Sequence, residues 1–246
     1  MSPPRALILA AGRGERLRPL TDTCPKPLLD VGGRPLIAWH LQALATAGVR
    51  EVVINTAWLE DRFAAALGDG ARWGLAITYS MEQRDHGGAL ETAGGIAKAL
   101  PHLVQPDNDV FWVVSGDVFL PTFPFAADAV QRFAEGTTLA HLWLVPNAPH
   151  HPDGDFGLDA AHARATPHGP RLTWASVGLF RASMFDGVPP DRPGKLRPLL
   201  DAALTADCLG AERWDGRWID VGTPERLQAA RDAATMPAGS GGRARR

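Results

Sequence analysis

A short stretch near the N-terminus places small residues and positive charge side by side. Residues 8–20 read ILAAGRGERLRPL, so an apolar run leads into Gly12 and Gly14. A glycine loop after a buried strand can bring backbone N–H groups close to phosphate oxygens, because glycine accepts positive φ and adds no side chain. Three arginines, whose planar guanidinium groups suit phosphate geometry, accompany the glycines: Arg13, Arg16 and Arg18. The stretch predicts a polyanion lying against the main chain.

A lysine flanked by two prolines follows this loop. Pro25 and Pro27 restrict the backbone and hold the stem of Lys26 in one direction. The spacing of a P-loop, G-x-x-x-x-G-K-[ST], is not found, and a dinucleotide fingerprint would need a small residue where Leu17 stands. For the glycines alone, a strand-to-helix turn with solvated arginines is the favoured interpretation. The added lysine favours phosphate binding.

Two aspartates each follow a short apolar run. Asp117 lies in SGDV after residues 110–114, and Asp220 lies in WIDVGTP before a helical pattern. Ligands of open α/β sheets bind at the carboxyl ends of the strands, and Mg²⁺ prefers one or two carboxylates together with phosphate oxygens. Each aspartate taken alone also fits a helix or turn cap.

Together these motifs resemble the signature of the sugar-1-phosphate nucleotidyltransferases. The matching strings are LAAGRGERL at 9–17, PLT at 19–21, PKPLL at 25–29 and W-x-D-x-G-T-P-E-R-L around Asp220, and the resemblance covers about residues 5–234. It implies that Asp117 and Asp220 hold Mg²⁺, that Arg16 lies near the β- and γ-phosphates and that Lys26 lies at the α-phosphate. It also implies a nucleoside triphosphate over the loop made of Ala10, Ala11, Gly12, Arg13 and Gly14.

The chemistry implied by this resemblance needs no general base. A sugar 1-phosphate has a second pKa near 6, by analogy with other phosphomonoesters, so its oxygen is already an anionic nucleophile at neutral pH. The site must position two phosphates that repel each other and neutralise the charge that develops during an in-line displacement. Bound Mg²⁺, Lys26 and Arg16 would supply that charge.

The resemblance also implies positions for the base and the sugar. Glu82, Glu91 and Thr92 would read the base edge, with Gly94 and Gly95 letting the backbone approach a planar ligand. The segment ALETAGG at 89–95 fits equally well as a helix N-terminus with acidic residues, and the long segment EQRDHGG at 82–88 leaves the base unsettled. Asp155, Gly157 and Ser176 occupy the sugar-binding positions. His150 and His151, without a spaced partner, indicate solvated loop residues more than a metal site.

Within the family, three strings resemble the uridylyltransferases that act on N-acetylmuramate 1-phosphate in cell-wall recycling. These strings are L-E-T-x-G-G, H-H-P-x-G-D-F-G-L and KLRPLL, in a short chain without an acyltransferase domain. Uridylyl transfer from UTP is therefore the leading hypothesis. Alternatives are a glucose- or mannose-1-phosphate enzyme that uses another base, and a non-catalytic regulatory module with the same fold. A dehydrogenase is a weak third option. The presence of Lys26, Asp117 and Asp220 favours catalysis.

The elements that must position these residues follow from the alternation of apolar runs with amphipathic stretches. This pattern indicates βαβ units, and hence one Rossmann-like α/β domain over residues 1–234, with a mostly parallel mixed sheet flanked by helices. Strands are expected near 6–10, 51–55, 76–79, 110–115, 138–145, 173–180 and 217–221, and helices near 35–48, 59–67, 90–100, 196–204 and 224–234. Residues 146–170 are expected to leave the sheet as a long excursion, and residues 235–246 to form a disordered tail.

Composition limits the classes of partner. The 246 residues are 45% hydrophobic and 21% charged, with a net charge of −2, so the chain lacks the basic field of a nucleic-acid binder. The apolar runs are shorter than the roughly 18 residues of a membrane span. Two cysteines and the lack of a signal peptide indicate a soluble cytoplasmic protein. We expect small-molecule substrates, no nucleic-acid or membrane partner, and a monomer or small homo-oligomer.

Overall fold

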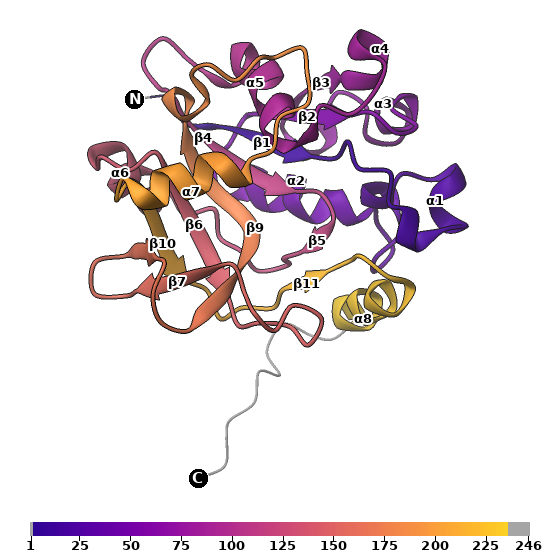
Figure 1. The fold of residues 1–246 in the computed structure, drawn as a ribbon. Helices are drawn as coiled ribbons and strands as arrows, with labels where there is room; N and C mark the ends of the chain where they lie inside the picture. Colours follow the sequence, from indigo (N-terminus) through magenta and orange to yellow (C-terminus); the bar gives the residue numbers. More distant parts are fainter. Residues whose placement is uncertain (1, 236–246) are drawn as a thin grey trace.

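A single large sheet forms the centre of the computed structural model, which describes residues 2–235 (Figure 1). Its nine described strands lie in the order β3 (Ala76–Met81), β2 (Glu51–Thr56), β1 (Arg5–Leu9), β4 (Val110–Ser115), β9 (Arg171–Arg181), β6 (Ala140–Val145), β10 (Leu209–Arg213), β8 (Arg164–Thr166) and β7 (Phe156–Asp159). A second, two-stranded sheet pairs β11 (Ile219–Asp220) with β5 (Val118–Phe119).

The sheet is mixed, as predicted. The pairs β1–β2, β1–β4, β2–β3 and β6–β10 are parallel, whereas β9 runs antiparallel to β4 and β6. Strand β4 shows why the central strands are apolar throughout. Val110, Trp112 and Val114 belong to the core on one face, and Phe111 and Val113 to the core on the other. Because β1 and β4 are parallel, the loops after both strands leave the same edge of the sheet.

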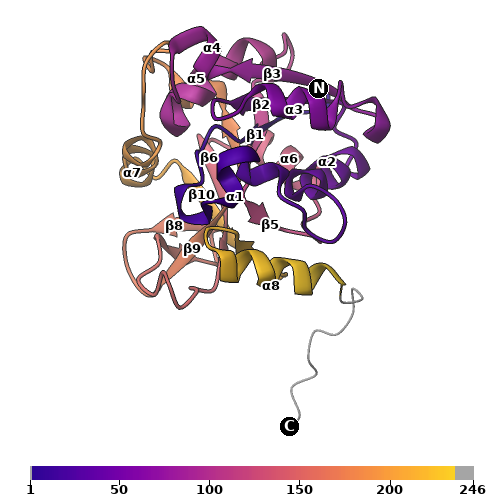
Figure 2. The same cartoon turned by 90° about the vertical axis from the view of Figure 1, so that its right-hand side faces the viewer.

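Helices cover both faces of the sheet. The core of one face includes side chains of α2 (Leu36–Thr46), α3 (Asp61–Leu67) and α6 (Ala127–Glu135), and that of the other face includes side chains of α5 (Glu91–Leu103) and α7 (Arg197–Thr205). Figure 2 shows α7 and α2 on opposite sides of the sheet. The remaining helices are α1 (Leu20–Thr23), α4 (Glu82–His86) and α8 (Pro224–Thr235), and α8 packs through Leu227 and Ala230 in a third core cluster with Phe119 of β5.

One expectation about the fold is wrong. Residues 146–170 do not simply leave the sheet, because β7 and β8 form an antiparallel hairpin at its edge and β7 also pairs with β9. These strands have four and three residues, too few for a periodic pattern to be recognised. The predicted tail lies outside the described residues, except for Thr235, which ends α8.

Cys24 and Cys208 are both free thiols. No helix among the described residues is long and apolar enough to cross a membrane.

A buried histidine lies beneath the edge that carries the loops. His40 of α2 is 0% exposed, its Nε2–H donates to the carbonyl oxygen of Val118 over 2.8 Å, and its Nδ1 has no hydrogen-bond partner among the described residues. Burial lowers the pKa of His40 to about 4, an effect that the bond to Val118 only partly offsets. The imidazole is therefore neutral in the folded protein near neutral pH.

This burial predicts an acid-sensitive stability. The unfolded chain binds a proton at His40 from about pH 6.5 and the folded protein only near pH 4, so the free energy of unfolding should fall by about 3 kcal/mol as the pH drops through this window. Urea unfolding between pH 7 and pH 4 would measure it. His40→Gln should remove this component of the fall, whereas His162→Gln, at an exposed position, should keep it. The same pH dependence in the wild type and His40→Gln would contradict the prediction.

Candidate active site

Three neighbouring cavities meet at the edge of the sheet where β1 and β4 end. The nucleotide cavity, as we call the first, has a volume of about 370 Å³, the inner cavity about 380 Å³ and the arginine cavity about 480 Å³. The nucleotide cavity shares Ser115 and Asp117 with the inner cavity and Lys26 with the arginine cavity, while Arg16 lines the inner and arginine cavities. The junction therefore carries a lysine, an arginine and a carboxylate.

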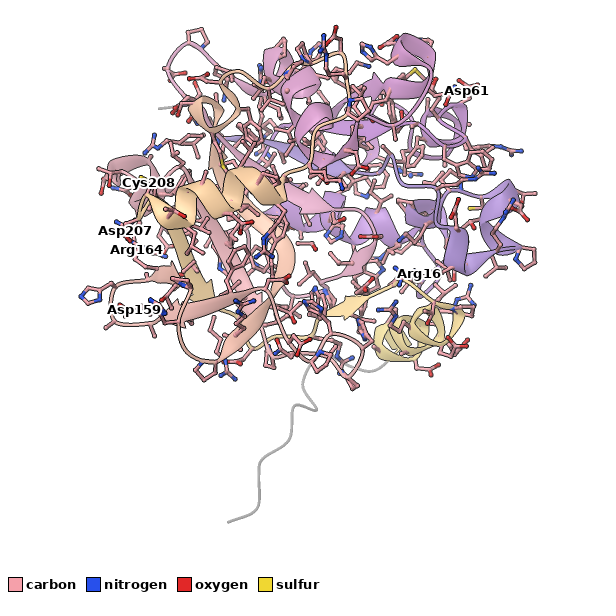
Figure 3. All side chains as sticks on the ribbon, viewed as in Figure 1. Arg16, Asp61, Asp159, Arg164, Asp207 and Cys208 are labelled. Carbon is pink, nitrogen blue, oxygen red and sulfur yellow. The ribbon has the colours of Figure 1, made fainter. Side chains whose placement is uncertain are left out.

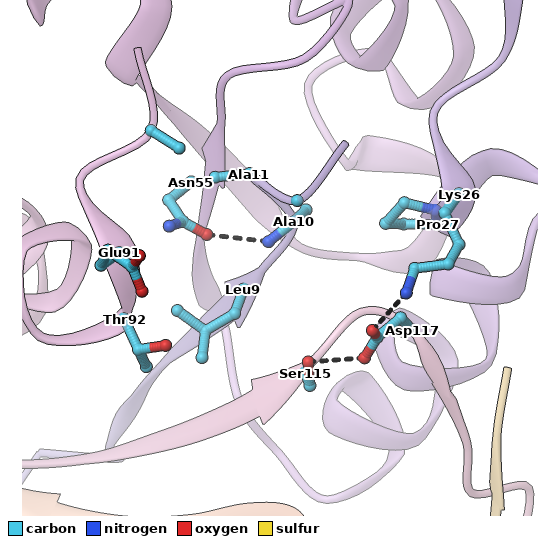
Figure 4. Close-up of a pocket in the computed structure, with 12 residues that line it drawn as sticks. Leu9, Ala10, Ala11, Lys26, Pro27, Asn55, Glu91, Thr92, Ser115 and Asp117 are labelled. Atoms are coloured by element: carbon cyan, nitrogen blue, oxygen red, sulfur yellow. Dashed lines mark hydrogen bonds and ion pairs between the residues drawn. The ribbon is translucent and has the colours of Figure 1, made fainter. Parts of the chain in front are cut away.

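The loop after β1 forms one wall of the nucleotide cavity, through Ala10, Ala11 and Gly12 (Figure 4). Gly14 has φ +70°, and a Cβ there would lie 3.0 Å from Thr21 Cγ2 and 3.2 Å from Lys26 Cβ. Glycine at this position therefore allows the loop to lie against the lysine. The loop's Arg13 lines the arginine cavity with Gly14, and its guanidinium lies over the Trp58 ring, 4.4 Å from the ring centre.

Lys26 points toward Asp117 across the cavity junction (Figure 4). The Lys26 side chain is 10% exposed, and its Nζ lies 2.6 Å from Asp117 Oδ2. Ser115 Oγ donates to the other carboxylate oxygen over 2.7 Å. Burial acts to raise the pKa of Asp117, but the Lys26 ammonium and the hydrogen bonds from Lys26 and Ser115 outweigh it, so this pKa is below its ordinary value. Asp117 is therefore an anionic carboxylate.

The second predicted aspartate lies in the same inner cavity. β11 pairs Asp220 with Val118 of β5, the residue after Asp117, and both aspartates line the cavity. Nη1 of Arg226 donates to Asp220 Oδ2 over 2.6 Å and to His150 Nε2 over 2.5 Å. Figure 3 shows Arg16 beside β11 and α8.

These two carboxylates fit a divalent cation that takes part of its coordination from a ligand. No group of three or more His, Cys, Asp or Glu side chains suited to a metal occurs in residues 2–235. Mg²⁺ is commonly held by one or two carboxylates, with phosphate oxygens and water completing the octahedron. Asp117 and Asp220, facing one cavity, match that donor set.

Only two of the three residues predicted to read the base line the nucleotide cavity. Glu91, at φ +58°, and Thr92 line the nucleotide cavity. Glu82 is 0% exposed and lies behind the wall, where Oε1 accepts from Asn55 Nδ2 over 2.8 Å and Oε2 accepts from Leu90 N over 2.7 Å. Burial raises the pKa of Glu82. Through these two hydrogen bonds Glu82 fixes Asn55 and Leu90 in the wall of the cavity. Asn55 lines the cavity and was not predicted from the sequence.

Gly94 and Gly95 also pack against protein rather than an open cavity. A Cβ at Gly95 would lie 2.6 Å from Glu82 Oε1, and one at Gly94 would lie 2.6 Å from the carbonyl oxygen of Arg192. The interpretation that these glycines admit a planar ligand is therefore wrong. They let α5 approach the Glu82–Asn55 pair and the chain before α7.

A hydrogen-bond relay through Glu82 predicts the effect of Glu82→Gln. The amide N–H of Ala10 donates to Asn55 Oδ1 over 2.8 Å, and Asn55 and Leu90 both donate to Glu82. Each of the two Glu82 oxygens faces a hydrogen-bond donor, so the side chain at this position must offer two acceptors. Glutamine has one acceptor oxygen, and its N–H₂ group would face a donor. We expect a loss of about 2 kcal/mol in the free energy of unfolding and weaker nucleotide binding. Urea unfolding of Glu82→Gln and of Glu135→Gln, on the exposed end of α6, would measure it; equal stabilities would contradict the prediction.

Two of the three predicted sugar-binding residues reach the inner cavity. Asp155 Oδ2 accepts from the backbone N–H of Trp174 over 2.8 Å, and Ser176 has φ +59°; both residues line the cavity. Gly157 does not line it. That glycine lies in β7, where a Cβ would collide with the carbonyl oxygen of His168.

Both histidines of the loop between β6 and β7 line the inner cavity, although they are also partly exposed to solvent. His150 Nε2 lies 3.5 Å from Asp220 Oδ2, and His151 Nε2 lies 3.3 Å from Asp155 Oδ1. Their position in the cavity was not predicted from the sequence. The H-H-P-x-G-D-F-G string was the signal that could have indicated it.

Comparisons with known proteins agree with this geometry. A family model described as nucleotidyl transferase matches residues 5–236. The chain is 47% identical over 237 residues to N-acetylmuramate alpha-1-phosphate uridylyltransferase of Neisseria meningitidis serogroup B, covering 94% of this chain and 98% of that protein. It is 30% identical over 230 residues to a mannose-1-phosphate guanyltransferase of Schizosaccharomyces pombe, covering 90% of this chain and 61% of that protein.

A solved structure supports the fold. A Bacillus anthracis structure assigned as a glucose-1-phosphate thymidylyltransferase superimposes with a TM-score of 0.77 at 22% identity, covering 96% of this chain and 97% of that chain. At this level of identity the likeness shows the fold alone.

Proposed function

The chain belongs to the nucleotidyl transferase family, and from this premise we propose that it transfers a uridylyl group from UTP to N-acetylmuramate α-1-phosphate with release of pyrophosphate. The observation that carries the proposal is the junction of three cavities at Lys26, Asp117 and Arg16. The 47% identity with the Neisseria uridylyltransferase supports the choice of substrates. N-acetylmuramate is a cell-wall sugar, so we infer a role in cell-wall recycling in the cytoplasm.

In this proposal each cavity binds one part of the reactants. UTP lies over residues 10–14 with its base in the nucleotide cavity, and its β- and γ-phosphates extend toward Arg13 and Arg16 in the arginine cavity. The sugar lies in the inner cavity beside Asp155 and Ser176. Its phosphate then meets the α-phosphate at Lys26. This arrangement requires no nucleophilic side chain.

The chemical step is an in-line displacement. A phosphate oxygen of the sugar 1-phosphate attacks the α-phosphorus, a new P–O bond forms, and the bond to the bridging oxygen breaks, so that pyrophosphate leaves with that electron pair. The nucleophile is already ionised near neutral pH, so the chain has no proton to remove. Lys26 offsets charge on the α-phosphate, and Arg16 offsets charge on the departing pyrophosphate.

We infer that Mg²⁺ binds at Asp117 and Asp220, where it would neutralise phosphate charge and help orient the two substrates. Lys26 and Arg226 pair with these same carboxylates in the structure. Each carboxylate thus has a cationic side chain beside it at the inner cavity.

The proposal is tested by incubating the protein with UTP, GTP, ATP or dTTP and a panel of sugar 1-phosphates, while pyrophosphate release is followed. We expect UTP with N-acetylmuramate α-1-phosphate to give the highest kcat/KM. Faster turnover of glucose or mannose 1-phosphate, or of another nucleotide, would overturn the substrate assignment. Absence of pyrophosphate release with every pair would overturn the assigned reaction.

A further inference from the structure

Two of the strings by which the sequence resembles the N-acetylmuramate 1-phosphate uridylyltransferases meet at one carboxylate beside the inner cavity. His151 and Asp155 belong to the H-H-P-x-G-D-F-G-L string, and Arg197 belongs to the KLRPLL string. His151 Nε2 lies 3.3 Å from Asp155 Oδ1, and Arg197 Nη1 lies 3.9 Å from the same oxygen. Arg197 is the first residue of α7. His151 and Asp155 line the inner cavity, and Arg197 approaches it from behind Asp155, from a chain segment more than 40 residues away.

Asp155 is fixed at this border. Its Oδ2 accepts from the backbone N–H of Trp174 over 2.8 Å, which leaves Oδ1 toward His151 and Arg197. A carboxylate in this position is a good acceptor for sugar hydroxyl groups. It would repel a sugar that itself carries a carboxylate, because like charges disfavour each other at short range.

Arg197 supplies the compensating charge. A guanidinium group is always protonated in proteins. The Arg197 guanidinium carbon lies 4.9 Å from the Phe156 ring centre, and Nε pairs with Asp201 Oδ1 over 2.8 Å. These contacts hold the guanidinium between Asp201 and Asp155, so that the two carboxylates share its charge. The N-terminus of α7, where this arginine lies, adds the positive end of the helix dipole.

We propose that Arg197, aided by His151, is the specificity determinant for a sugar 1-phosphate that bears a carboxylate. This inference rests on the proposed function, since it requires the sugar to bind in the inner cavity. Arg197 acts through its charge on the substituent of the sugar and not on the reacting phosphates, which meet at Lys26. A neutral sugar 1-phosphate gains little from this charge, so the effect of removing it should depend on the substrate.

The experiment compares two sugars that differ in one acidic group. N-acetylmuramate 1-phosphate carries a lactyl carboxylate, and N-acetylglucosamine 1-phosphate lacks it. We expect Arg197→Ala to lower kcat/KM for the acidic sugar about tenfold and to change kcat/KM for the neutral sugar by less than about twofold. Arg197→Lys should retain most of the preference for the acidic sugar. The loss should shrink as the salt concentration rises.

A matched control separates specificity from folding. Arg132 of α6 is also an exposed helical arginine paired with an aspartate four residues away. Neither of its acidic partners, Asp128 and Glu212, lines any of the three cavities, so Arg132→Ala should leave the ratio of the two kcat/KM values unchanged. An equal loss for both sugars in Arg197→Ala would assign Arg197 a structural role and overturn the inference alone, as would an unchanged ratio. A wild-type enzyme that turns over neither sugar with UTP would overturn the proposed function as well.

Discussion

Lys26→Ala is expected to lower kcat about 100- to 1,000-fold, because one positioned charge that stabilises the transition state contributes about 3 to 4 kcal/mol. The Lys26 side chain is 10% exposed and its Nζ lies 2.6 Å from Asp117 Oδ2, at the junction of the nucleotide and arginine cavities. Alanine removes this charge from the point where, in the proposed function, the two phosphates meet. Pyrophosphate release at saturating substrates would measure the effect.

A second lysine–aspartate pair provides a control for the packing contribution of Lys26. Lys98 Nζ lies 2.6 Å from Asp85 Oδ2, and the Lys98 side chain is 14% exposed, so the pair has similar geometry and burial outside the three cavities. Lys98→Ala should reduce thermal stability while kcat stays within about threefold of the wild type. If Lys26→Ala retains near-normal kcat, or if both variants lose kcat to the same degree, Lys26 has no specific part in the chemistry.

The strands that could be predicted from the sequence are those in which every residue along the central part of the strand is apolar and buried. β1 and β4 are apolar on both faces and follow the alternation of strands and helices along the chain, so their existence and their place in the sheet are readable. β7, β8 and β10 are short and owe their pairing to partners remote in sequence, such as β10 beside β6. Local pattern carries no information about such partners, because a three-residue strand has no measurable period.

The same distinction applies to the site. Lys26, Asp117 and Asp220 were predicted because each combines a chemically suitable side chain with a recognisable local string. Asn55 and Arg226 were not predicted, because their roles depend on which elements meet. Asn55 Nδ2 finds its partner 27 positions away in Glu82, and Arg226 bonds to His150, 76 positions away. Residues that hold others in place leave little signal in a local string.

Asp117→Asn and Asp220→Asn are each expected to weaken the Mg²⁺ dependence of turnover, and together to abolish it. Each aspartate supplies a negative oxygen to the inner cavity, and each pairs with a cation: Lys26 with Asp117 and Arg226 with Asp220. Asparagine removes the negative ligand and leaves that cation without its counter-charge, so both changes oppose a divalent metal. Mn²⁺ affinity in the presence of UTP should fall about tenfold or more for each single variant.

Two measurements separate metal binding from chemistry: an electron paramagnetic resonance titration of Mn²⁺ with UTP, and the Mg²⁺ concentration that gives half-maximal pyrophosphate release. Asp128→Asn is the control, because Asp128 forms an ion pair with Arg132 on the surface of α6, outside the inner cavity. It should leave both titrations unchanged, while the double variant should show no response to Mg²⁺. If Asp117→Asn and Asp220→Asn bind Mn²⁺ as the wild type does, the metal lies elsewhere, and these two carboxylates serve only to hold Lys26 and Arg226.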